Sequence, residues 1–109
     1  MSAAAYDIVV ERYAAWSQEF VYKDASGVPV NLAGASARMQ VRKNRKSDEV
    51  LLELTDQDGI TLGEKGEIEM FANEAETADW DFDGVYDLKV NEERVLEGDF
   101  RVKAGVTRD

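Results

Sequence analysis

The sequence predicts an all-β domain, an antiparallel sandwich or barrel of six to eight short strands with at most one short helix. Apolar and polar residues alternate along most of the chain, which is the period of a half-buried strand. Turn-forming residues separate these runs, and no strand–helix–strand rhythm indicates a parallel sheet. The 109 residues suit a single domain over 1–109, with short flexible ends at about 1–5 and 105–109.

The first half of the chain contains the clearest strand pattern. Residues 6–10 and 17–23 are expected strands, and Gly27 supplies a turn before an extended edge segment at 28–32, which contains the single proline. Along 35–43, small and apolar residues share one face while serine, arginine and glutamine share the other. A polar hairpin loop follows this strand.

The second half contains shorter runs and the one expected helix. Asn73 is a candidate N-cap for a helix over 73–79, because Glu76 follows three residues later and completes a capping box. The remaining expected strands cover residues 50–55, 60–62, 67–71, 84–91 and 94–106. These elements together describe one sandwich without linkers or repeats.

Composition excludes several classes of function. The chain has 13 basic and 23 acidic side chains, a net charge of −10, and neither cysteine nor histidine. Disulfides, thiolate or imidazole metal sites and an imidazole base are therefore excluded. The negative charge argues against binding to nucleic acid or to an anionic membrane. We expect a protein that is not an enzyme, needs no cofactor and acts through other proteins.

A basic cluster stands out against this acidic background. It consists of Arg38, Arg42, Lys43, Arg45 and Lys46. One interpretation is an exposed loop whose cations pair with neighbouring carboxylates. The other is a docking patch for an acidic surface, including the acidic surface of another copy of the chain.

Aromatic residues form a second candidate site. Tyr13, Trp16 and Trp80 could provide a platform on which sugar rings stack. Aromatic residues near strands are more often part of the core, so core packing is the favoured interpretation.

Carboxylates form a third candidate site. Asp79, Asp81 and Asp83 precede a glycine in the spacing that opens a calcium loop. The twelfth position of such a loop should be glutamate but is Val90, which favours a polar turn that leads into a strand. Other acidic residues alternate along expected strands and are read as solvated faces rather than a catalytic pair; they are Glu67, Glu69, Glu97 and Asp99.

The order of residues along the chain is similar to that of one known family. The pattern D..G.PV.L.GA...M.VR is matched by Asp24, Gly27, Pro29, Val30, Leu32, Gly34, Ala35, Met39 and Arg42. The later segments DGITLGEKGEIEM, GVYDLKV and RVLEGDFRVKAGVTR continue the same order of elements. The chain thus resembles the immunoglobulin-like amino-terminal domain of phage baseplate upper proteins and related stand-alone tail or tail-fibre components.

This resemblance implies an immunoglobulin-like sandwich and a structural role in a virion. The expected role is an adaptor in the tail, baseplate or tail fibre, synthesised in the host cytoplasm. Its partners would be other virion proteins and further copies of itself, with no nucleic acid and no membrane. The alternatives are a carbohydrate- or host-receptor-binding module and a head decoration protein. The family supplies no catalytic residues.

Overall fold

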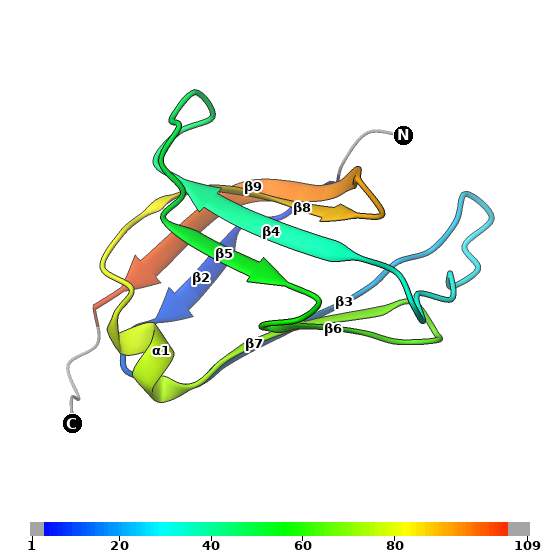
Figure 1. Cartoon of the computed structure of the whole chain (residues 1–109), viewed down its shortest axis with the longest axis horizontal. Coiled ribbons are helices and arrows are strands. Elements are labelled where there is room, and N and C mark those ends of the chain that lie inside the picture. Colours follow the sequence, from blue (N-terminus) through cyan, green and yellow to red (C-terminus); the bar gives the residue numbers. More distant parts are fainter. Residues whose placement is uncertain (1–3, 105–109) are drawn as a thin grey trace.

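The computed structural model describes residues 4–104, which form two β-sheets packed face to face with one short helix at one end (Figure 1). Residues 1–3 and 105–109, which include most of the expected flexible ends, lie outside this range. The described part contains nine strands, compared with the six to eight expected, and the helix α1 (Glu74–Ala78). No helix within it is long and apolar enough to cross a membrane.

The larger sheet has six strands. They are β1 (Ala4–Ala5), β2 (Ile8–Glu11), β4 (Ala37–Arg42), β5 (Leu52–Thr55), β8 (Gly84–Val90) and β9 (Glu93–Lys103). Their order is β1-β9-β8-β4-β5, and β2 also pairs with β9. The short strands β1 and β2 run parallel to β9, whereas the other neighbours are antiparallel. The strand expected over 6–10 therefore begins later, as β2 at Ile8, and Tyr6 and Asp7 form a break between β1 and β2.

The smaller sheet has three antiparallel strands in the order β3-β7-β6. They are β3 (Trp16–Val21), β6 (Ile60–Leu62) and β7 (Glu67–Ala72). In a variable-type immunoglobulin domain, the first, second, fourth and fifth main strands share one sheet, and the other main strands share the second sheet with added edge strands. The present chain follows this arrangement except that its first strands, β1 and β2, pair with β9 in the larger sheet. The prediction of an immunoglobulin-like β-sandwich is confirmed.

The alternation in β4 places its apolar residues in the core. Ala37, Met39 and Val41 are buried, while Arg38 between them is exposed on the outer face. The extended segment expected at 28–32 forms one isolated bridge, between Lys23 and Pro29, within the connection from β3 to β4. Proline lacks the backbone donor that a continuous ladder needs, which accounts for the short pairing.

An aromatic cluster in the core joins β3, β9 and the segment that follows α1. Trp16 from β3 lies edge-to-face against Phe100 of β9, with ring centroids 6.1 Å apart. Trp80 contacts both rings, at 5.9 Å from each. These rings join the two sheets without a covalent link. Aromatic pairs bury a large apolar surface and favour a specific ring geometry, so the cluster stabilises the packing of one sheet on the other.

The segment between β1 and β2 is held against β9 by side chains as well as backbone. The Tyr86 hydroxyl donates to the carbonyl of Tyr6 at 2.6 Å, and the Asp99 amide donates to Asp7 Oδ1 at 3.0 Å. A Cβ at Gly98 would collide with that Tyr6 carbonyl, so glycine permits this close approach. Burial raises the pKa of the Tyr86 hydroxyl well above its ordinary value, because the interior disfavours the charged phenolate.

The helix α1 begins with the expected capping box. The Glu76 amide donates to Asn73 Oδ1 at 2.8 Å, and the Asn73 amide donates to Glu76 Oε1 at 2.9 Å. Thr77 is fully buried, and its hydroxyl donates to the Ala14 carbonyl at 2.8 Å. Thus the helix is tied to the turn that precedes β3.

Candidate functional site

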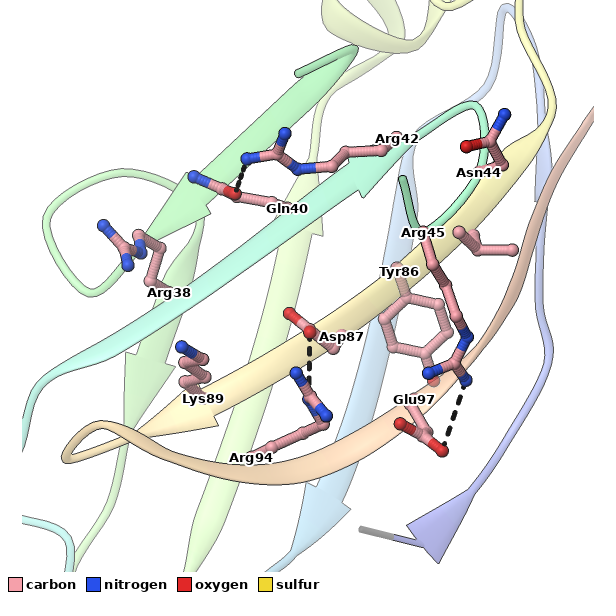
Figure 2. Close-up of a pocket in the computed structure, with 11 residues that line it drawn as sticks. Arg38, Gln40, Arg42, Asn44, Arg45, Tyr86, Asp87, Lys89, Arg94 and Glu97 are labelled. Atoms are coloured by element: carbon pink, nitrogen blue, oxygen red, sulfur yellow. Dashed lines mark hydrogen bonds and ion pairs between the residues drawn. The ribbon is translucent and has the colours of Figure 1, made fainter. Parts of the chain in front are cut away.

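A furrow of about 270 Å³ lies on the outer face of the six-stranded sheet, over β4, β8 and β9 (Figure 2). Five basic side chains line it, and we call it the basic furrow. These are Arg38, Arg42, Arg45, Lys89 and Arg94. Two carboxylates, Asp87 and Glu97, also line it, so cations outnumber anions there although the chain as a whole is strongly acidic.

Three of the cations form a row across three adjacent strands. Arg38 of β4 is directly opposite Lys89 of β8, and Lys89 is directly opposite Arg94 of β9. Like charges in directly opposite positions destabilise a sheet, by about 0.2–1 kcal/mol for each pair. The row therefore makes no favourable contribution to folding by itself, which distinguishes it from an ordinary solvated face.

Three of the five cations that line the furrow have partners within the protein. Arg94 Nε is 3.0 Å from Asp87 Oδ2, and Arg45 is 3.4 Å from Glu97 Oε2, as the dashed lines in Figure 2 mark. Arg42 donates to Gln40 Oε1 at 3.0 Å and to a loop carbonyl at 2.7 Å.

The other two cations of the furrow have no such partners. Among residues 4–104, Arg38 and Lys89 have neither an ion pair nor a side-chain hydrogen bond. These two residues are directly opposite one another on β4 and β8, which are interior strands of the sheet. They are thus available to an anionic group that enters the furrow.

The basic cluster expected from sequence is divided by the structure. Arg38, Arg42 and Arg45 line the furrow, whereas Lys43 and Lys46 are exposed in the adjoining loop and do not line it. Sequence reasoning missed Lys89 and Arg94. The sequence places Lys89 between two inward-facing apolar residues, which assigns its side chain to an outer face. This pattern does not indicate which strand lies beside it.

Two of the three residues expected to form an aromatic platform are buried. Trp16 and Trp80 are each only 7% exposed and pack against one another and Phe100. Tyr13 is partly exposed and carries the Arg12 guanidinium 4.9 Å from its ring centre. Neither tryptophan presents a free ring face, so the core-packing interpretation accounts for both. This removes the observation on which the carbohydrate-binding alternative depended.

The three aspartates of the calcium candidate serve separate contacts. Asp79 ends α1, Asp81 lies 3.6 Å from Arg12, and Asp83 Oδ1 accepts the Val102 amide at 2.9 Å. Within the described part of the chain, no three acidic side chains are grouped so that they could hold a metal ion. The polar-turn interpretation therefore accounts for these residues.

The other acidic pairs noted in the sequence lie on different sheets. Glu67 and Glu69 belong to β7 of the three-stranded sheet, and Glu97 and Asp99 belong to β9 of the six-stranded sheet. The two pairs are thus separated by the thickness of the sandwich.

Comparisons with known proteins identify the fold. No family model and no curated protein matches the chain. The chain is similar to a solved structure of the extracellular domain of the voltage-gated sodium channel beta4 subunit, which is described as a parallel homodimer with a role in cell–cell adhesion. The match covers 97% of this chain and 98% of that one, with 17% identity and a TM-score of 0.53.

A second solved structure comes from photo-crosslinking work on multimeric cell-adhesive interactions of sodium channel beta subunits. It covers 98% of both chains, with 15% identity and a TM-score of 0.49.

The predicted relationship to phage baseplate and tail proteins is wrong, and so is the predicted location in a virion. The structural similarity is to extracellular domains of a channel subunit instead. The residues that carried the phage resemblance have general structural roles. Gly27 and Gly34 adopt positive φ angles in turns, while Leu32 and Met39 are buried. Turn glycines and core residues of this kind are general features of a β-sandwich. These residues therefore indicate the fold and do not indicate a particular family.

Proposed function

We propose that this immunoglobulin-like domain binds another protein, and that the basic furrow receives an acidic surface of that partner. The row formed by Arg38, Lys89 and Arg94 is the observation that carries this proposal. Arg38 and Lys89, which are directly opposite and have no ion pair among the described residues, repel one another in the free protein, and a carboxylate-bearing partner would relieve that repulsion. These two belong to neighbouring interior strands of the sheet.

The charge distribution supports an acidic partner. A chain with a net charge of −10 repels acidic proteins at long range, so a local excess of cations in a hollow is a feature that selects where such a protein can dock. The fold also supports an association role. The beta4 extracellular domain, which shares it, forms homodimers and is described in connection with cell–cell adhesion, which is consistent with a function that is not enzymatic.

The test is the binding of a fluorescein-labelled peptide of about ten glutamates, measured by anisotropy at about 50 mM salt, where surface charges are weakly screened. We expect Lys89→Glu to weaken binding by about tenfold or more. Lys65→Glu is the matched control, because it changes the net charge equally but lies in the turn between β6 and β7, beyond the furrow. Equal weakening by both variants, or no binding to the wild-type protein, would overturn the proposal.

A further inference from the structure

We infer that the partner of the basic furrow is a second copy of this chain, which docks through the outer face of its three-stranded sheet. This inference rests on the proposed function and names the occupant of the same site. The contact is head-to-tail, because it joins two different surfaces of the same molecule.

The outer face of the three-stranded sheet is acidic. Glu19 of β3 is directly opposite Glu69 of β7, and both side chains are exposed. Across residues 4–104, neither carboxylate has an ion pair or a hydrogen bond to a side chain. Glu67 lies on the same face, one pair further along. We call these three glutamates the acidic face.

No cation shares the acidic face with these glutamates. The strands β3, β6 and β7 contain neither lysine nor arginine, and the nearest lysines, Lys23 and Lys65, lie beyond the strand ends. The acidic face is therefore the counterpart of the furrow: a pair of like charges in register, with no compensation from its own sheet.

Apolar side chains flank the acidic face. Val21 and Phe71 lie on the same side of the sheet as Glu19 and Glu69, and each is 49% exposed. In the furrow, the partly exposed Val85 contributes apolar surface beside the cations. Charged groups flanked by exposed apolar side chains are typical of a protein interface, since burying the apolar area supplies affinity and the charges set the orientation.

The same charges exclude a symmetric dimer through either surface. Two furrows brought together would oppose Arg38 and Lys89 to their own copies, and two acidic faces would oppose three glutamates to three others. Only the contact between unlike surfaces is attractive. The two surfaces lie on opposite sides of the sandwich (Figure 1), so a molecule whose furrow is filled still presents its acidic face, and further copies can add.

The experiment uses two neutralised variants and their mixture. Arg38→Gln/Lys89→Gln disables the furrow, and Glu19→Gln/Glu69→Gln disables the acidic face. Each removes a like-charge contact, so neither is expected to impair folding. Light scattering on a sizing column at about 50 mM salt should show a mass that rises with concentration for the wild type, and a monomer for each variant alone.

The mixture distinguishes a head-to-tail contact from any other. One variant retains its acidic face and the other its furrow, so an equimolar mixture should form a heterodimer that grows no further. High salt, about 500 mM, should dissociate it. Variants that associate as well as the wild type, or a mixture that stays monomeric while the wild type associates, would overturn the inference.

The oligoglutamate peptide separates failure of the inference from failure of the proposed function. If the peptide binds the furrow but the wild-type protein remains a monomer well above the dissociation constant of the peptide, the acidic partner is a different protein and the inference is wrong. If the peptide does not bind and the protein does not associate, the proposed function fails as well.

Discussion

The two sheets of the sandwich carry the same unfavourable feature with opposite sign, but they are supported differently. The six-stranded sheet opposes Arg38 to Lys89, and the three-stranded sheet opposes Glu19 to Glu69. Beneath the cations, side chains reinforce the backbone ladder, as Tyr86 does by donating to Tyr6. Within β3, β6 and β7 the ladder itself makes the connections between strands.

This difference indicates that stability and recognition depend on different residues of the six-stranded sheet. Side-chain bonds and the aromatic cluster hold the six-stranded sheet from within, so its outer charges are free to serve a partner. Substitutions at the seams of that sheet should therefore reduce stability, while substitutions of the outer charges should alter binding and leave the fold intact.

Gly98→Ala should reduce the free energy of unfolding by about 2–3 kcal/mol, because the added Cβ would collide with the Tyr6 carbonyl and displace the segment between β1 and β2. Gly27→Ala, in the connection between β3 and β4, is the control, because its φ angle of +82° is the only obstacle and the surrounding space is open. It should lose about 1 kcal/mol. Urea unfolding measures both, and equal losses would contradict the role given to Gly98.

Tyr86→Phe should reduce the free energy of unfolding by about 1 kcal/mol, because the Tyr6 carbonyl loses a buried donor. Tyr22→Phe, just after β3, is the matched control, since no hydrogen bond of its hydroxyl is present among residues 4–104. Thermal unfolding of the two variants should separate them. A Tyr22 variant as unstable as the Tyr86 variant would show that the bond to Tyr6 is not what secures the sheet.

The stability of the wild-type protein should decline more steeply at alkaline pH than that of Tyr86→Phe. Burial raises the pKa of Tyr86 in the folded state, whereas the unfolded chain releases this proton near pH 10. The contribution is therefore fully present below about pH 10 and is lost as the pH rises above it, by up to about 1.4 kcal/mol per pH unit. Denaturant midpoints measured between neutral and alkaline pH provide the test, and parallel profiles would refute it.

Arg38→Glu and Glu19→Lys should each raise the free energy of unfolding slightly, by about 0.2–1 kcal/mol. The first places a carboxylate opposite Lys89, and the second places an ammonium opposite Glu69, so repulsion becomes attraction in both sheets. Chemical unfolding at low salt is the measurement. A loss of stability in either variant would mean that the native charge contributes to folding, which the account excludes.

Local signals in the sequence were sufficient for much of the fold. The alternation through β4 correctly predicts which side chains are buried, because the pleat fixes the face of every second residue. The capping box of Asn73 and Glu76 predicts the start of α1, because both bonds lie within one turn. The break between β1 and β2 depends instead on the approach of the Tyr6 carbonyl to Tyr86 and Gly98, which are distant in sequence.

The candidate site was only partly predictable for the same reason. Arg38, Arg42 and Arg45 are neighbours in the sequence, so their cluster was visible. Lys89 and Arg94 join them only because β8 pairs with both β4 and β9, and no local pattern reports that order. Burial of the tryptophans was one of two open interpretations, since periodicity places a ring on a face but does not say what covers it.

The most direct test of the basic furrow is a titration of the ¹⁵N-labelled protein with the oligoglutamate peptide, followed through the backbone amide resonances. The titration uses the Glu19→Gln/Glu69→Gln variant, which retains the furrow but is not expected to self-associate. The account predicts that the largest shifts occur at Arg38, Lys89 and Arg94, on three adjacent strands, and that the amides of the three-stranded sheet are unaffected. Shifts centred on the three-stranded sheet, or spread evenly over the lysines and arginines of the surface, would contradict it.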